Sequence, residues 1–161
     1  MKHFVKSIYG FTAILLVFSI SLIGNQSFAQ YCEPMFLGGC DDGTNINSVI
    51  LIGENSTSID DLNTGCALDG YDDKTNLPAV ELFKGESYTI NISTQMNEFM
   101  AGTSAALWID FNDNFTFEPS ERVAVYNGLL SLSGTDITIH IPANAPLGVH
   151  RLRIMGGMGM I

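Results

Sequence analysis

Strict alternation of apolar and polar residues in short runs is the feature that most constrains the fold of this chain. Over residues 88–93 and again over 137–141 every second residue is apolar, and the residues between them are Thr, Asn, Ser or His. A period of two indicates strands with one buried and one solvated face. No window shows a sustained period of 3.6 residues, so we expect a mainly β protein.

Other short apolar runs recur between segments rich in Gly, Asn, Asp and Pro, which is typical of strands joined by turns. We expect further strands at 46–52, 105–109, 122–126 and 149–154, and a polar loop over 54–61. The total of seven or eight short strands predicts an all-β fold, an antiparallel β-sandwich of the jelly-roll or fibronectin-like kind with one core. A closed barrel is the alternative.

Details of the pattern predict which side chains face the core. We expect Val123 and Val125 on one side of their strand, and Leu152 and Ile154 opposite the two arginines of the last strand. Pro142 is expected to end the strand that contains the alternating isoleucines. The terminal stretch 155–160 contains three glycines, which argues against a strand there.

The N-terminal segment predicts the cellular location of the protein. Lys2 and Lys6 precede an almost wholly apolar stretch at 11–23, and Ser27-Phe28-Ala29 places small residues at −3 and −1 of a cleavage site. This is the pattern of a secretory signal helix, which we expect to be cleaved after Ala29. A retained anchor is the alternative, but the stretch is shorter than the roughly 20 residues of a membrane span. We therefore expect residues 1–29 to be a signal peptide and the protein to be secreted or exposed at the cell surface.

Charge excludes two classes of partner. The chain has 17 acidic and 7 basic residues and a net charge of −10, and removal of residues 1–29 would remove two lysines and no acids. Phosphate binding depends on clustered Lys and Arg, so we expect no nucleic-acid partner and no binding to anionic membranes after cleavage. A protein or glycan partner stays open, because the sequence identifies no ligand.

Three cysteines, all in the first third of the exported part, would lie in an oxidising compartment where disulfides persist. A bridge between Cys40 and Cys66 would close a polar loop, and pairs of Cys32 with either of them are the alternatives. One thiol is left over, and we expect it to be Cys32. The spacing is not that of a zinc site.

Residues 110–121 form the one pattern of side chains in this sequence that indicates a ligand site. Oxygen-bearing side chains occupy the first, third, fifth, ninth and twelfth positions, which is the spacing of a twelve-residue calcium loop. The predicted ligands are Asp110, Asn112, Asn114, the main-chain carbonyl of Thr116, Glu118 and Glu121. The alternative is an Asx-rich connection that uses these side chains to hold its own turns.

One position of this loop departs from the calcium pattern. The sixth position normally holds Gly because the chain turns sharply there, and here it is Phe115. A bulky ring resists a positive φ, so we expect a distorted loop or a weakly held ion. If calcium binds, its expected role is to fix the loop.

No arrangement in the chain indicates catalysis. The histidines beyond the signal segment are His140 and His150, and both fall in predicted strands, where a structural role is expected. The sequence contains no Gly-x-Ser-x-Gly, phosphate loop or His-Glu-x-x-His motif. We expect no catalytic residues and no enzymatic activity.

Several stretches together resemble one family of bacterial secreted and cell-surface domains. They are residues 31–40, 46–49, 65–66, 70–75, 83–90, 108–113 with Phe117 and Glu121, 141–148 and 151–153. In this pattern the region 30–161 is similar to the GEVED domain. The resemblance implies a β-sandwich accessory module with no established chemistry of its own.

The sequence departs from the family at two places. The family usually has Gly where Phe115 stands, and it continues past the Arg-x-Arg strand to a fourth Cys and an acidic strand that this chain does not reach. The resemblance therefore implies a domain truncated at its C-terminus, in which Cys32 would normally pair with the missing cysteine.

We expect an exported, non-catalytic accessory or interaction module, with calcium as a candidate ion. One alternative is the non-catalytic N-terminal part of a secreted peptidase or glycosidase. Another is a calcium-dependent carbohydrate-binding module, for which the candidate platform residues are Phe111, Phe115 and Tyr126.

Overall fold

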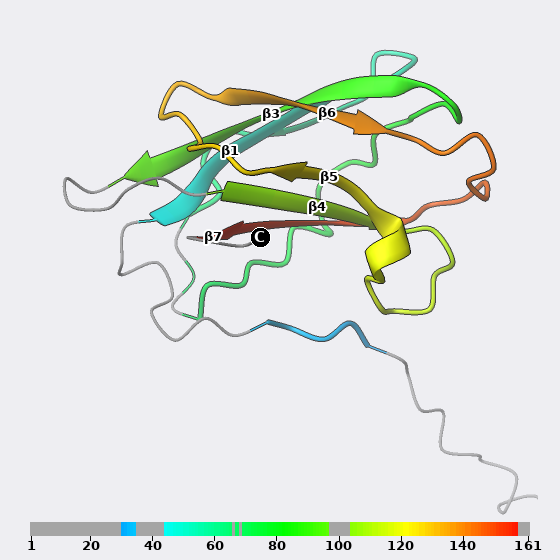
Figure 1. Cartoon of the computed structure of the whole chain (residues 1–161), viewed down its shortest axis with the longest axis horizontal. Coiled ribbons are helices and arrows are strands. Elements are labelled where there is room, and N and C mark those ends of the chain that lie inside the picture. The colour runs from blue at the N-terminus through cyan, green and yellow to red at the C-terminus, as the bar shows by residue number, and fades with distance from the viewer. Residues whose placement is uncertain (1–29, 35–43, 66, 68, 97–103, 158–161) are drawn as a thin grey trace, which may run out of the picture. The chain divides into compact units, whose positions relative to one another are not determined.

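Alternating apolar residues give this chain two antiparallel β-sheets that pack face to face (Figure 1). The computed structural model describes residues 30–34, 44–65, 67, 69–96 and 104–157. Within these residues the elements, in chain order, are β1 (Thr44–Ile52), β2 (Ser58–Asp61), β3 (Ser87–Met96), β4 (Ser104–Asp110), the 3₁₀ helix η1 (Pro119–Glu121), β5 (Arg122–Tyr126), β6 (Thr135–His140) and β7 (Arg151–Gly157).

The first sheet has the strand order β2-β1-β3-β6, and the second has the order β5-β4-β7. Every paired neighbour runs antiparallel. The expected all-β fold and antiparallel β-sandwich are therefore confirmed. The expected signal helix lies outside the described residues. Within the described part of the chain, no helix is long and apolar enough to cross a membrane.

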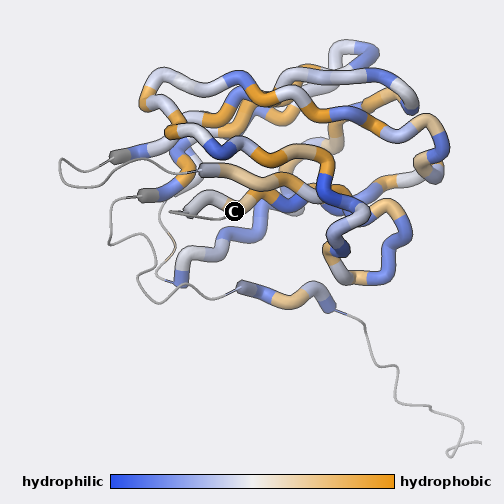
Figure 2. Tube along the Cα trace, viewed as in Figure 1, coloured by the Kyte–Doolittle hydropathy of each residue, from blue (hydrophilic) through white to orange (hydrophobic). Residues whose placement is uncertain are grey.

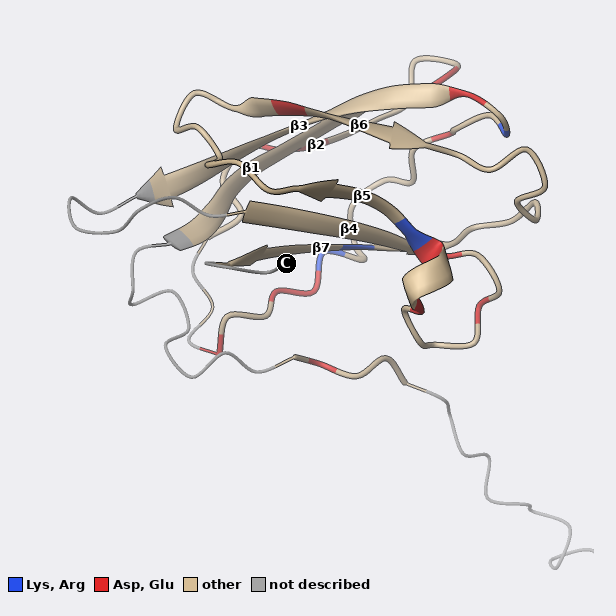
Figure 3. Ribbon diagram, viewed as in Figure 1, with Lys and Arg blue, Asp and Glu red and all other residues tan. Residues whose placement is uncertain are grey.

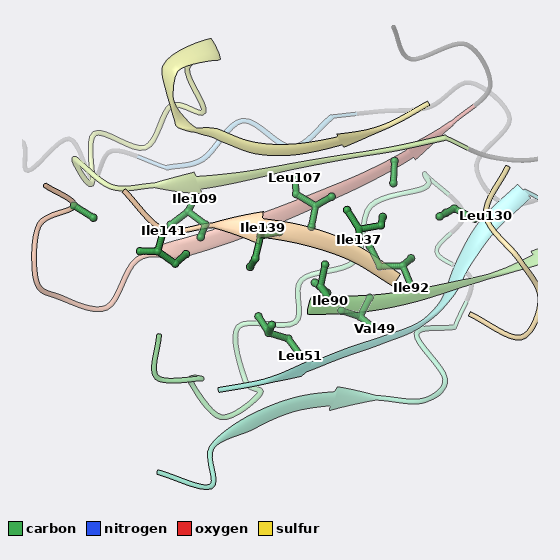
Figure 4. Close-up of a cluster of buried hydrophobic side chains, with 12 residues drawn as sticks. Val49, Leu51, Ile90, Ile92, Leu107, Ile109, Leu130, Ile137, Ile139 and Ile141 are labelled. Atoms are coloured by element: carbon green, nitrogen blue, oxygen red, sulfur yellow. The ribbon is translucent and has the colours of Figure 1, made fainter. Parts of the chain in front are cut away.

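The core lies between the two sheets, where the predicted alternation places its apolar side chains (Figure 4). Leu51 on β1 is opposite Ile90 on β3, and Ile90 is in turn opposite Ile137 on β6. β-branched side chains in cross-strand pairs pack well on a pleated surface, which explains why isoleucine dominates here. The colours of Figure 2 show the resulting mixture of apolar and polar residues along each strand.

Four details of the predicted strand pattern are wrong. Residues 58–61, expected to be loop, form β2, because Ile59 pairs opposite Leu51 at the edge of the first sheet. Residues 155–157, expected not to form a strand, extend β7 beside β4. Glycine has a low intrinsic preference for strands, but pairing with β4 stabilises the strand at these residues.

The third error concerns β5. Val123 packs against the core, whereas Val125 is 39% exposed. A register shift between Leu107 and Trp108 on β4 breaks the regular alternation along the β4–β5 pair. The prediction for β7 holds better, since Leu152 and Ile154 pack against the core. The fourth error is at the start of β7, since Val149 and His150, expected in this strand, lie before it, and Val149 is exposed.

Candidate functional site

The twelve-residue segment 110–121 connects β4 to β5, two neighbouring strands of the second sheet. Asp110 is the last residue of β4, and Glu121 is the last residue of η1, immediately before β5. Both side chains are buried, with relative exposures of 0% and 5%. The loop therefore begins and ends with a buried carboxylate.

Asp110 organises the first half of the loop through its two carboxylate oxygens. Oδ1 accepts a hydrogen bond from the backbone N–H of Asn114 at 3.3 Å, and Oδ2 accepts one from the N–H of Phe115 at 3.0 Å. Oδ2 also accepts a hydrogen bond from the hydroxyl of Tyr31 at 2.7 Å. These three donors compensate the buried negative charge.

Asn112 and Asn114 form two successive Asx turns. The Oδ1 atom of Asn112 accepts the backbone N–H of Asn114 at 3.0 Å, and the Oδ1 atom of Asn114 accepts the N–H of Thr116 at 2.8 Å. The two amide nitrogens donate to the carboxylate of Glu118, at 2.9 and 2.6 Å. Four predicted ligand residues are thus linked to one another by hydrogen bonds within the loop.

Glu121 closes the loop by joining its last turn to its first. Its Oε1 atom accepts backbone N–H groups of Phe111 and Asn112 at 3.0 and 3.3 Å, and its Oε2 atom accepts the N–H of Glu118 at 3.2 Å. A carboxylate that accepts several backbone donors is strongly held. The sequence spacing predicts Glu121 as a calcium ligand. In this structure its carboxylate instead accepts hydrogen bonds from the backbone of the loop.

Phe115 adopts the backbone conformation that its position demands. Its φ is +67°, in the left-handed region that the sixth position of such a loop requires, and the neighbouring Asp113 has φ +54°. The turn is thus formed in spite of the ring, which costs about 1 kcal/mol or more relative to Gly. The ring lies 5.2 Å from that of Tyr31, and Tyr31 lies 5.2 Å from Phe117. These aromatic contacts offset part of the backbone cost.

The loop fits a hard cation in part. The oxygens of Asp110, Asn112 and Asn114 lie in one hydrogen-bonded loop, and each Asn oxygen accepts a single hydrogen bond and so retains a lone pair. Glu121 does not act as a bidentate ligand while both its oxygens hold backbone N–H groups. No group of three or more His, Cys, Asp or Glu in the described residues is placed to hold a metal ion.

An aromatic and basic cluster covers the outer side of this loop, and sequence reasoning did not anticipate it. The guanidinium of Arg151 lies 4.8 Å from the centre of the Tyr31 ring, and that of Arg153 lies 4.2 Å from the centre of Phe117. Arg153 also donates to the carbonyl of Cys32 at 2.6 Å. Burial, and then the hydrogen bond to the Asp110 carboxylate, raise the pKa of Tyr31 well above its usual range.

The two histidines beyond residue 30 have contacts of a structural kind. His150 Nδ1 lies 3.0 Å from a carboxylate oxygen of Asp113, and its ring packs edge-on against Phe111. His140 Nδ1 lies 3.1 Å from Ser87 Oγ across the β3–β6 pair, and both residues are exposed. Among the described residues no carboxylate forms a hydrogen bond with His140 as the third member of a triad would.

The remaining predicted site residues are only partly within the described chain. Cys32 is exposed and forms no disulfide with a described residue, while Cys40 and Cys66 lie outside the described residues. Of the candidate platform rings, Phe111 and Tyr126 pack against the core and Phe115 is 40% exposed. The ring of Phe115 belongs to one aromatic cluster with Tyr31 and Phe117.

A groove of about 1310 Å³ runs along β7. Its walls are β7, the inner faces of β1 and β2, the coil 69–84 that leads from β2 to β3, the segment 145–150 before β7, and part of the loop 110–121. On this coil Lys74 forms ion pairs with Asp72 at 2.9 Å and Asp61 at 3.6 Å, and Asp73 lies 3.6 Å from Arg151. The hydrogen bond to Asp72 raises the pKa of Lys74, so this amine stays charged.

Comparison with known protein families gives one match. Residues 104–160 match the GEVED domain, which confirms the resemblance over the part of the chain that contains β4, the loop, β5, β6 and β7. A search of curated proteins and a search of solved structures each returned no match.

Proposed function

We propose that this chain is an exported, non-catalytic interaction module of a bacterial secreted or cell-surface protein. The observation that carries the proposal is the groove along β7, whose walls combine apolar side chains with a few charged ones. A concave surface of this composition suits recognition of another polypeptide. The polar residues of the neighbouring loop, in contrast, are engaged with their own backbone. The GEVED match and the signal-like N-terminus support the same role.

Export is tested by locating the protein in an expressing bacterium. The protein is recovered separately from the cytoplasm, the periplasm or envelope, and the medium, and the intact mass of each fraction is measured. We expect a mature chain beginning at Gln30 outside the cytoplasm. Protein that begins at Met1 and stays in the cytoplasm would contradict the proposal. Changing Ala29→Arg blocks the small-residue position before the cleavage site and serves as the control.

We further propose calcium as a ligand of the loop 110–121. Asp110 and Glu121 are both buried, and among the described residues neither forms an ion pair. Buried charges in proteins are normally paired or coordinate a metal, so a cation bound by Asp110 would add to the compensation that its three hydrogen-bond donors give. Asp110, Asn112 and Asn114 would supply side-chain oxygens, and the role of the ion would be to stabilise the loop.

Calorimetric titration of calcium into chelator-treated protein tests this second proposal, together with a thermal melt at each end point. We expect a binding isotherm and a higher Tm with calcium. Asn114→Ala should weaken both effects, whereas Asn91→Ala, which removes a half-buried side chain on β3 in the other sheet, should leave them unchanged. A folded protein that gives neither heat nor a shift in Tm does not bind calcium.

A further inference from the structure

Several exposed apolar side chains line the groove along β7. Leu147 and Val149, in the connection between β6 and β7, are 85% and 84% exposed, and Phe83 is 52% exposed. All three line the groove. Single exposed apolar residues are common, but a group of them beside a concave apolar surface marks a site of association.

The floor of the groove is also apolar. Ile46, Ile59, Val80 and Leu82 pack against the outside of the core and line the groove. Ile46 is on β1 and Ile59 is on β2, whereas Val80 and Leu82 belong to the coil 69–84. Within the described residues β7 pairs with β4 alone, so its other edge also borders the groove. An unpaired strand edge beside an apolar floor is a surface prone to association.

Figure 3 marks the charged residues along the ribbon, and most of the described basic ones line the groove. Four of the five described basic residues line the groove, namely Lys74, Lys84, Arg151 and Arg153, together with five of the fourteen described acidic residues. Positive and negative charges nearly balance here, although the chain as a whole has a net charge of −10. Two copies of this chain repel each other least when these faces meet.

We propose that this face is the interface of a homodimer. Leu147 and Val149 are exposed and line the same groove as its apolar floor, so a two-fold axis through this face would bring the exposed apolar side chains of each copy against the groove of the other. The surface is therefore complementary to itself. This proposal rests on the proposed interaction role of the groove, and it specifies a second copy as the partner.

Sedimentation velocity over a range of concentrations tests the proposal, with protein recovered from outside the cytoplasm and its N-terminus defined by mass. We expect a monomer–dimer equilibrium. The double variant L147S/V149S should raise the dissociation constant at least about 100-fold, because the dimer loses four buried apolar side chains. Higher salt should strengthen the wild-type dimer, since salt screens the repulsion between two acidic chains.

The matched control is the double variant L129S/L132S. These leucines are 63% and 62% exposed and do not line the groove, so the dissociation constant should stay at the wild-type value. Because all four positions are exposed, neither variant should unfold the protein, and a thermal melt verifies this. A wild-type protein that stays monomeric, or a dimer that survives L147S/V149S unchanged, overturns the homodimer. Either result leaves the separate test of export intact.

Discussion

The hydroxyl of Tyr31 donates a hydrogen bond of 2.7 Å to the buried carboxylate of Asp110, across 79 residues of sequence. This contact joins the first described part of the compact unit to the start of the loop 110–121. The same ring contacts Phe115 and Phe117 and lies beneath Arg151. Tyr31 therefore contributes to the stability of the loop.

The substitution Tyr31→Phe should lower the free energy of unfolding by about 1.5–3 kcal/mol. The buried carboxylate of Asp110 loses a hydroxyl donor, while the ring contacts remain. Urea denaturation measures the change. Tyr71→Phe is the matched control, since the hydroxyl of Tyr71 forms no hydrogen bond with another described residue, and it should have little effect. Equal losses in the two variants would show that the contact with Asp110 contributes nothing specific.

High pH should weaken the contribution of the Tyr31 hydroxyl to the free energy of unfolding. The pKa of Tyr31 in the folded protein lies above the ordinary value of about 10, because burial and the Asp110 carboxylate disfavour the phenolate. Above about pH 10 the unfolded chain loses this proton while the folded protein keeps it, so ionisation favours the unfolded state. The stability gap between wild type and Tyr31→Phe should therefore narrow from neutral pH to about pH 11. A constant gap would contradict the raised pKa.

The fold was accessible to sequence reasoning because its core strands carry their own signal. Pairs of isoleucines two residues apart, at 90 and 92 in β3 and at 137 and 139 in β6, identify these strands and their inner faces. β2 and the end of β7 carry no such signal, since each is stabilised by pairing with a neighbouring strand. Strand formation at such positions depends on tertiary context, which a local pattern does not contain.

The candidate site was accessible only in part. Spacing within 110–121 identifies Asp110, Asn112, Asn114 and Glu121, because the loop is continuous in sequence. Tyr31, Arg151 and Arg153 reach the same region from distant segments, so no local spacing relates them to the loop. The available signal was the alternation on β7, which places the two arginines on the face opposite Leu152 and Ile154.

Removing the carboxylate of Glu121 should destabilise the folded protein. Glu121→Ala leaves three backbone N–H groups without their acceptor in a buried position, and we expect a loss of about 2–4 kcal/mol in the free energy of unfolding. Glu86→Ala, at an exposed position in the turn before β3, should cost less than about 0.5 kcal/mol. Chemical denaturation of both variants measures the difference. Similar small losses would mean that the loop does not depend on Glu121.

Substitution of two glycines near the groove distinguishes the cost of a steric clash from the cost of backbone strain. A Cβ at Gly53 would collide with the side chain of Val80 and the carbonyl of Glu81, in the coil that forms one wall of the groove. Gly53→Ala should therefore destabilise the protein by about 2–4 kcal/mol. Gly65 has φ +81° and no atom within 4 Å of the added Cβ, so Gly65→Ala should cost only the strain of a left-handed residue, about 1–2 kcal/mol. Denaturation midpoints of the two variants should follow this order, and the reverse order would show that the coil moves away from Gly53 at little cost.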